Sequence, residues 1–459
     1  MFFHQFYLGC LAHASYMLGS GGTAAVVDPQ RDVEIYLEEA RRQGLRIAYV
    51  IETHLHADFV SGHRELATRT GAEIYVGRAA QAAFPHHAVE EGDELRFGSC
   101  ALSFLETPGH TLESLCVLVT DLEKSAEPFA VLTGDTLFIG DVGRPDLSPS
   151  HTPQQLAALL YDSLHRKLLA LPDSVLVYPA HGAGSLCGRN ISAESSSTIG
   201  RQRATNYALR PMPKEDFVRI LTAEFAARPG YFARDAEINR QGAAALAELP
   251  PLRAMSPGQV AECGNSVILL DTRPAALYGA GHVPGALNIG LGGQFASWAA
   301  TVLGLDRPII LIAEDAERVA ESRMRLARVG VEKVIGYLEG GVEAWRRAGQ
   351  PWAAVPQISV EQLAAELHQH PGGMQVLDVR RAAEWNAGHI EGAVHRPLDT
   401  LCLEGDGEFL DRTRPVAVHC KGGYRSSIAS GILKRAGFQD VSNVVGGFDA
   451  WQVAGLPKV

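Results

Sequence analysis

The apolar residues between positions 2 and 200 are grouped in short runs, which turn residues and helical stretches separate. Short apolar runs bounded by Gly, Pro, Asn or Asp are typical of β-strands. The runs that we interpret as strands are residues 24–27, 47–51, 73–76, 102–106, 115–119, 130–132 and 175–178. This part of the chain is therefore predicted to be an α/β domain with many strands.

Residues 1–27 contain no Asp, Glu, Lys or Arg, a composition that would also suit a signal peptide or a membrane segment. No basic residues precede the apolar stretch, however, and the turn Gly19-Ser20-Gly21-Gly22 interrupts it. Strand, turn, strand is therefore the better interpretation. We expect a cytoplasmic protein.

The pattern becomes helical between residues 201 and 249. The residues that have the spacing of one apolar helical face are Phe217, Ile220, Leu221 and Phe225. This spacing predicts a helix here. The pattern ends at Leu249-Pro250-Pro251, which is typical of a linker between domains.

The second half of the chain contains an internal repeat. An Asp-x-Arg sequence, a Gly-His-x-x-Gly-Ala turn and a Gly-Gly-x-x-Ala-Trp sequence each occur twice, in the same order. The matching stretches are 267–273 with 374–380, 281–286 with 388–393, 308–312 with 415–419, and 340–345 with 446–451. Two homologous α/β domains are therefore predicted after the first one. The predicted domains are residues 1–250, 251–354 and 355–459.

Composition narrows the classes of function. With a net charge of −11 and a pI near 5.9, the chain has no basic field for nucleic acid or anionic lipid, so neither nucleic acid nor a membrane is expected as a partner. The 7 cysteines are odd in number, widely spaced and without a CxxC pair, which favours a reducing compartment over a disulfide framework. Small-molecule chemistry is the better hypothesis.

The first candidate site follows the predicted strand 47–51. His54 and His56 would project to the same side of an extended chain, and Asp58 would lie beside them. Two imidazoles and a carboxylate delivered together at a strand end usually hold a metal ion. The alternative interpretation is that His54 and His56 are two surface histidines in a loop. The further motifs downstream favour the metal site over this alternative.

Those motifs are Thr107-Pro108-Gly109-His110, Thr133-Gly134-Asp135 and Tyr178-Pro179-Ala180-His181, each after a β-type run. Together with the first stretch they resemble the metallo-β-lactamase superfamily. The resemblance implies an αββα sandwich with the metal at the strand ends. Two-metal members of the superfamily usually carry His directly after the motif's Asp, whereas this chain has Phe59 there, which weakens a two-metal hydrolase interpretation.

The sequences around these motifs, including Gly143-Arg144-Pro145-Asp146, are similar to those of persulfide dioxygenases. That resemblance implies one Fe(II) per chain, with His54, His110 and Asp135 as ligands. Two His and one carboxylate form a facial triad, which leaves coordination positions open for oxygen and a sulfur substrate. The resemblance gives His56, Asp58 and His181 the role of groups that orient the ligand rings by hydrogen bonds, with occasional metal binding as the alternative.

Two further residues near the motifs are assigned to substrate binding. Arg144 would contact the anionic substrate, with an internal salt bridge to Asp141 or Asp146 as the alternative. Cys187 would be a thiol near the metal, with a small buried core residue as the alternative. The histidines outside any motif, to which we assign no chemistry, are His13, His63, His86, His87, His151 and His165.

The repeated half resembles tandem rhodanese domains. In the second repeat a strand ends at His419-Cys420 and a loop with two glycines and two cations follows. Glycines allow backbone N–H groups to turn inward, and the next helix and the cations add positive charge, which suits a thiolate that accepts sulfane sulfur. We assign catalysis to Cys420, Lys421 and Arg425. The residues assigned to substrate binding are Gly422, Gly423, Tyr424 and Ser426.

The first repeat departs from this pattern. Ala313 occupies the position of Cys420, and the stretch Glu314-Asp315-Ala316-Glu317, with three acidic residues, occupies that of the cationic loop. This repeat can neither form a persulfide nor hold an anion, so we interpret it as a structural or docking domain.

The resemblances together imply a fused persulfide dioxygenase and sulfurtransferase. A low-molecular-weight persulfide such as glutathione persulfide would be oxidised with O2 to sulfite, and Cys420 would carry sulfur between persulfide, sulfite and thiosulfate. One alternative is a glyoxalase II-like hydrolase of thiol esters with an accessory sulfurtransferase, and another is a non-catalytic sulfur relay or sensor. Homo-oligomerisation is left open.

Overall fold

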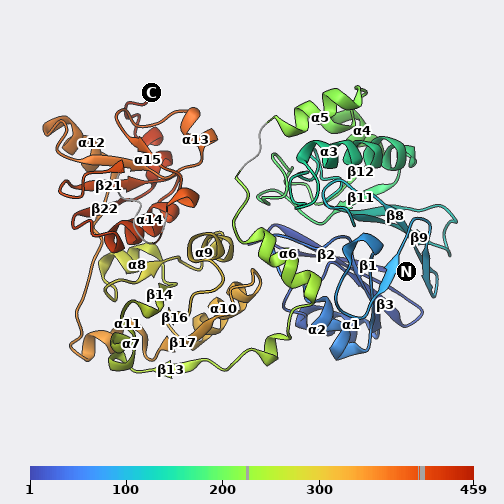
Figure 1. The fold of residues 1–459 in the computed structure, drawn as a ribbon, viewed down its shortest axis with the longest axis horizontal. Coiled ribbons are helices and arrows are strands. Elements are labelled where there is room, and N and C mark those ends of the chain that lie inside the picture. The colour runs from blue at the N-terminus through green and yellow to red at the C-terminus, as the bar shows by residue number, and fades with distance from the viewer. Residues whose placement is uncertain (224–226, 402, 404–408) are drawn as a thin grey trace. The chain divides into compact units, whose positions relative to one another are not determined.

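The computed structural model describes residues 1–223, 227–401, 403 and 409–459. The chain forms two compact units (Figure 1). The first unit contains residues 1–249 and 327–330, and the second contains residues 250–326 and 331–459. Within the described residues, no helix combines the length and the hydropathy needed to span a membrane.

The first unit is built on two six-stranded sheets with the orders β1-β2-β3-β4-β5-β6 and β12-β11-β10-β9-β8-β7. The strands of the first sheet are β1 (Phe2–Leu8), β2 (His13–Ser20), β3 (Thr23–Val27), β4 (Arg46–Glu52), β5 (Glu73–Gly77) and β6 (His87–Val89). Those of the second are β7 (Glu94–Phe97), β8 (Cys100–Glu106), β9 (Leu115–Asp121), β10 (Ala130–Gly134), β11 (Leu176–Pro179) and β12 (Ser197–Thr198). Every strand predicted in this part is present, as is the predicted strand, turn, strand at its start.

Helices cover the sheets of the first unit (Figure 1). They are α1 (Glu34–Gln43), α2 (His63–Thr70), α3 (Pro153–Asp162), α4 (Ile199–Thr205), α5 (Lys214–Thr222) and α6 (Phe232–Gln241). One apolar core joins the facing sheets through β2, β3, β8, β9 and β10. A second core packs α1 and α2 on the first sheet, and a third packs α3 and α5 on the second. The layers are therefore helix, sheet, sheet, helix, which confirms the predicted sandwich.

The helical prediction for residues 201–249 is correct in kind and wrong in one detail. Phe217 and Leu221 on α5 are buried in the core, as predicted. Ile220 is 39% exposed, because the buried face of this short helix is narrower than the predicted one. Phe225 lies outside the described residues.

The second unit contains two five-stranded sheets with parallel pairing and the same strand arrangement. The first has β13 (Arg253–Met255), β14 (Ile268–Asp271), β15 (Leu287–Asn288), β16 (Ile309–Ile312) and β17 (Val334–Leu338). The second has β18 (Gln357–Ile358), β19 (Gln375–Asp378), β20 (Val394–His395), β21 (Val416–His419) and β22 (Val441–Val444). The predicted parallel sheets are confirmed. We keep the terms repeat one and repeat two for residues 251–354 and 355–459.

The helices of repeat one are α7 (Pro257–Cys263), α8 (Ala275–Ala280), α9 (Phe295–Leu303), α10 (Ala316–Ala327) and α11 (Gly341–Arg347). Those of repeat two are α12 (Val360–Gln369), α13 (Ala382–Asn386), α14 (Tyr424–Arg435) and α15 (Gly447–Val453). In both repeats the Gly-Gly-x-x-Ala-Trp sequence starts the last helix, and the tryptophan indole donates a hydrogen bond to the carbonyl six residues later: Trp345 to Pro351 and Trp451 to Pro457.

Candidate metal centre and sulfur-carrying loop

The candidate metal ligands of the first unit are carried by loops that follow buried strands. His54 comes after β4, His110 after β8, Asp135 directly after β10 and His181 after β11. Gly134, with φ of +50°, ends β10 in the left-handed region. A Cβ there would lie 2.5 Å from Oγ1 of Thr53, so only glycine lets the two strand ends approach this closely.

His54, His110 and Asp135 converge on one point. The Nε2 atoms of His54 and His110 lie 3.8 and 3.4 Å from Oδ2 of Asp135. All three side chains are buried, and these three atoms have no hydrogen-bond partner in the part of the chain that the structure describes. Orphaned buried acceptors facing one another are what a site for a cation requires. The three predicted metal ligands therefore fit a metal ion.

Hydrogen bonds fix both histidine rings in the form that can bind a metal. Nδ1 of His110 donates to the carbonyl of Arg144 at 2.9 Å. Nδ1 of His54 lies 3.0 Å from Oγ1 of Thr53, whose own hydroxyl donates to Asp28 at 2.8 Å. With Nδ1 as the donor, each ring keeps the Nε2 lone pair for the site. Burial lowers the pKa of His54 and of His110, which also favours neutral rings.

His181 links two carboxylates beside this point. Its Nδ1 lies 2.7 Å from Oδ1 of Asp135, and its Nε2 lies 2.9 Å from Oδ2 of Asp58. Burial alone would lower the pKa of His181, but Asp135 and Asp58 raise it well above the usual value. One carboxylate oxygen of Asp135 thus contacts His181, and the other faces His54 and His110. The predicted role of His181 and Asp58, to orient the ligands, stays a prediction that this geometry suits.

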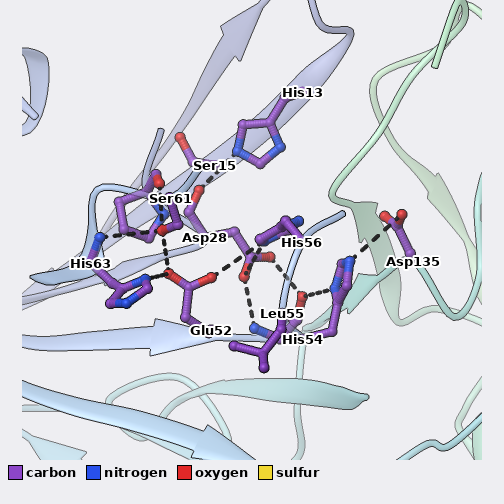
Figure 2. Close-up of polar contacts among 12 residues, drawn as sticks. His13, Ser15, Asp28, Glu52, His54, Leu55, His56, Ser61, His63 and Asp135 are labelled. Atoms are coloured by element: carbon purple, nitrogen blue, oxygen red, sulfur yellow. Dashed lines mark hydrogen bonds and ion pairs between the residues drawn. The ribbon is translucent and has the colours of Figure 1, made fainter. Parts of the chain in front are cut away.

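His56 faces a different set of carboxylates. Its Nε2 lies 3.3 Å from Oδ1 of Asp28 and 3.4 Å from Oε2 of Glu52. Figure 2 shows these two carboxylates on one side of His56 and the pair His54 and Asp135 on the other. Burial would lower the pKa of His56, but the carboxylates raise it to about 10. The ring is therefore oriented by Asp28 and Glu52.

Five residues of this buried network were missed at the level of sequence. Glu52 accepts a hydrogen bond from Ser61 at 2.5 Å and lies 3.1 Å from Nδ1 of His63. His13 contacts the carbonyl of Asp28 at 2.8 Å. Asp28 follows β3 with φ of +51°, an unusual conformation for a residue other than glycine. The one available signal was that Asp28, like Asp135, comes directly after a buried strand.

Arg144 and Cys187 both lie near the metal centre. The Arg144 guanidinium donates to both oxygens of Asp146 at 2.6 and 2.7 Å, and to the carbonyl of Leu186 at 3.2 Å. Its contacts are thus those of the alternative, the internal salt bridge, and substrate binding stays a prediction. Cys187 is fully buried beside Asp58 and His181, and burial raises its pKa well above the usual value. Its role in substrate binding also stays a prediction.

Cys420 lies in the loop between β21 and α14 of repeat two. Its Sγ accepts hydrogen bonds from the N–H of Gly423 at 3.1 Å and from Oγ of Ser426 at 3.5 Å. Gly423, with φ of +100°, precedes α14, so the start of this helix faces the sulfur. One backbone N–H and one hydroxyl therefore point at Sγ of Cys420, and the assigned role of the loop stays a prediction.

The two predicted cations of the loop differ in their surroundings. Lys421 is exposed. Arg425 forms two hydrogen bonds of 2.7 Å with the carboxylate of Glu384 on α13, so its charge is shared with that partner. The glycine pair that starts the last helix supports the loop: a Cβ on Gly447 would lie 2.3 Å from the carbonyl oxygen of Cys420. Gly341 has the same relation to Ala313 in repeat one, at 2.7 Å.

Comparisons with known proteins identify the families of both halves of the chain. Residues 8–181 match the family model of the metallo-beta-lactamase superfamily. A crystal structure of a metallo-beta-lactamase from Staphylococcus aureus subsp. aureus COL superposes with a TM-score of 0.68 and 32% identity, over 74% of this chain and 99% of that one. The chain belongs to the metallo-beta-lactamase superfamily. It also carries the rhodanese-like domain twice, at residues 259–348 and 359–454.

Superfamily members with different reactions resemble this chain to a similar degree. The persulfide dioxygenase ETHE1 of Bos taurus is 32% identical over 215 residues, which are 45% of this chain and 75% of the relative. A hydroxyacylglutathione hydrolase of Methylobacillus flagellatus is 34% identical over 222 residues, which are 47% of this chain and 80% of the relative. Membership of the metallo-beta-lactamase superfamily therefore gives the scaffold, and the reaction has to be inferred from the site.

Proposed function

We propose that this protein is a persulfide dioxygenase fused to a sulfurtransferase, and that residues 1–250, 251–354 and 355–459 are its domains. The observation that carries the proposal is the convergence of two neutral histidines and one carboxylate in the same chain as a cysteine cradled for sulfur transfer. The similarity to persulfide dioxygenases and to rhodanese-like domains supports the same conclusion, a role in sulfur metabolism.

His54, His110 and Asp135 would hold one Fe(II). Bound there, Fe(II) would supply open coordination positions at which a persulfide sulfur and O2 meet. Persulfide, O2 and water would give thiol, sulfite and protons. Thr53 and the Arg144 carbonyl keep the two rings oriented, and all three ligand side chains are buried.

Cys420 would perform the transfer step. Its thiolate attacks the outer sulfur of a persulfide, the bond between the two substrate sulfurs breaks, and the thiol leaves. Sulfite then attacks the outer sulfur of the Cys420 persulfide, which gives thiosulfate and returns the Cys420 thiolate. The Gly423 N–H and the start of α14 stabilise negative charge on sulfur in both states. Sulfite made in one reaction is thus consumed in the other.

Repeat one would act as the structural partner of the active loop. Tyr424 is the first residue of α14, directly after the loop that carries Cys420. Its hydroxyl donates to the carbonyl of Gly290 in repeat one at 2.7 Å. Ser427 on α14 donates to Oδ1 of Asn288 at 2.7 Å, and Asn288 is itself bound to the carbonyls of Asp271 and Arg273. The Asp-x-Arg turn of repeat one therefore supports the helix that starts at Cys420's loop.

Tyr424→Phe is expected to slow sulfur transfer by about 2–10-fold, because it removes one hydrogen bond worth about 0.5–1.5 kcal/mol that holds the loop. The rates of thiosulfate formation and of Cys420 alkylation by iodoacetamide measure this. Tyr161→Phe removes a similar bond, to the Met212 carbonyl at 2.8 Å in the first unit, and should leave both rates unchanged. Equal rates for Tyr424→Phe and the wild type would contradict this role of repeat one.

A metal-dependent hydrolase of thiol esters is the second candidate. The similarity to hydroxyacylglutathione hydrolases favours it. Phe59 counts against it, because a phenyl ring offers no ligand to a second metal beside Asp58.

One experiment separates the two candidates. The protein is loaded with Fe(II) without oxygen, its metal content is measured, and it is then given glutathione persulfide or a thiol ester of glutathione. We expect about one iron per chain, persulfide-dependent oxygen uptake and sulfite formation. Thiol-ester cleavage without persulfide-dependent oxygen uptake would overturn the proposal in favour of the hydrolase.

A further inference from the structure

One side chain from the end of the first unit binds the loop that carries the metal-site histidines. Asn239 lies in the last turn of α6 and is 1% exposed. Its Nδ2 donates to the carbonyls of His56 at 2.7 Å and Phe59 at 2.8 Å, and its Oδ1 accepts the N–H of Ser61 at 2.8 Å. The amide thus uses both of its donors on one turn of the loop 56–61.

The hydrogen bonds made by Asn239 come from outside the residues that match the metallo-beta-lactamase superfamily model. The match to the metallo-beta-lactamase superfamily ends at residue 181, whereas α6 spans Phe232–Gln241. The end of α6 is fixed to the first unit by further bonds. The N–H of Ala83 donates to the carbonyl of Arg240 at 2.8 Å, and Arg64 donates to the carbonyl of Gly242 at 3.0 Å. Asn239 is therefore held rigidly where it meets the loop.

The loop that Asn239 binds determines where the site residues lie. His56 and Asp58 are in it, and His54 lies two residues before its first residue. The Phe59 side chain is fully buried, with its ring centroid 4.2 Å from that of His13 and 4.3 Å from that of His56. Apart from Asn239, Ser61 is held by Glu52 and by the Pro29 carbonyl at 2.9 Å.

We propose that Asn239 is a positioning residue of the metal centre, which sets the geometry of loop 56–61 through its three hydrogen bonds. The inference rests on the proposed metal site and not on the reaction that occurs there. Buried backbone carbonyls left without a donor are costly, so a change at Asn239 would shift the loop and with it His54 and His56. Supporting groups of this kind typically contribute 10–100-fold to metal affinity.

Asn239→Asp tests this with the least change in shape. The variant keeps an oxygen for the Ser61 N–H but places a carboxylate oxygen against the carbonyls of His56 and Phe59. Co(II) affinity, measured by competition with a chelator at neutral pH, is expected to fall about 10–100-fold. Asn443→Asp is the matched control: it changes a buried amide in the second unit that donates to Gln357 at 2.8 Å, and its Co(II) affinity should equal that of the wild type.

The readout separates this inference from the proposed function, because Co(II) binding needs neither persulfide nor oxygen. An unchanged affinity in folded Asn239→Asp would overturn the positioning role even if the protein is a dioxygenase. A loss of affinity shared by Asn443→Asp would overturn it as well.

Hydrogen exchange of the wild-type protein gives a second test that needs no variant. If Asn239 organises the loop, the Ser61 amide is protected in the absence of Co(II) as well. Its exchange rates with and without Co(II) should then differ by less than about threefold. Protection of Ser61 that arises only when Co(II) is present would mean that the metal, and not α6, orders this loop. That result would overturn the inference, and it remains decisive if Asn239→Asp does not fold.

Discussion

Asp135→Ala is expected to abolish iron binding and persulfide-dependent oxygen uptake while sulfur transfer at Cys420 continues. Asp135 provides the carboxylate that faces His54 and His110, and its other oxygen binds His181. Loss of a supporting group alone costs about 10–100-fold in metal affinity, so loss of a ligand should cost more than about 100-fold. Iron content by elemental analysis and oxygen consumption with glutathione persulfide measure the effect.

The control for Asp135→Ala is Asp173→Ala, which removes a carboxylate that pairs with Arg203 at 3.1 Å on the surface. This variant should keep both iron and oxygen uptake. Transfer of sulfur from thiosulfate to cyanide, which needs only Cys420, should be the same in both variants. Iron retained at one equivalent in Asp135→Ala would show that the assigned ligand set is wrong.

Cys420→Ser is expected to have the opposite effect. A hydroxyl cannot carry sulfane sulfur, so thiosulfate formation should fall by at least about 1000-fold, while oxygen uptake and sulfite release persist. Sulfite would then accumulate as the end product. Parallel assays of oxygen, sulfite and thiosulfate on the same iron-loaded sample measure this.

Cys263→Ser in repeat one serves as the control, because Cys263 is a partly exposed thiol outside the active loop. It should form thiosulfate at the wild-type rate. Thiosulfate formation undiminished in Cys420→Ser would exclude the second half of the proposed function. Asp135→Ala and Cys420→Ser together distinguish an enzyme with two separate sites from one in which a single site performs both reactions.

Much of the scaffold could be predicted from the sequence because it depends on local patterns. The run 47–51 is a strand because its apolar residues are contiguous and buried, and the strand predicts where His54 lies. The same reasoning places Asp135 after β10 and Cys420 after β21. The three ligands follow strands of both sheets, His54 after β4 and His110 and Asp135 after β8 and β10, so their convergence was predicted from the resemblance of the motifs and not from strand neighbourhood.

The contacts that hold the site residues in place could not be predicted, because they join distant parts of the chain. Asn239 is 183 positions from His56. The partner of Arg425 is Glu384, which belongs to α13, and the partner of Tyr424 is in the other repeat. Pairings of this kind follow from tertiary packing and have no signature in local periodicity. For Arg144 the residue types allowed both a salt bridge and an anion site, and the fold supplies Asp146.

The helix α14 is buried along most of its length, from Ser426 to Leu433, and the surface it meets in repeat one is formed by Leu287, Asn288 and Gly290. Ala313, where the nucleophile would be, belongs to a different segment. The surface that repeat one presents to α14 therefore does not depend on the residue at position 313. Without repeat one, the buried face of α14 in repeat two would be exposed to water and would need polar residues instead. We therefore expect deletion of repeat one to be tolerated less well than the absence of a nucleophile from it.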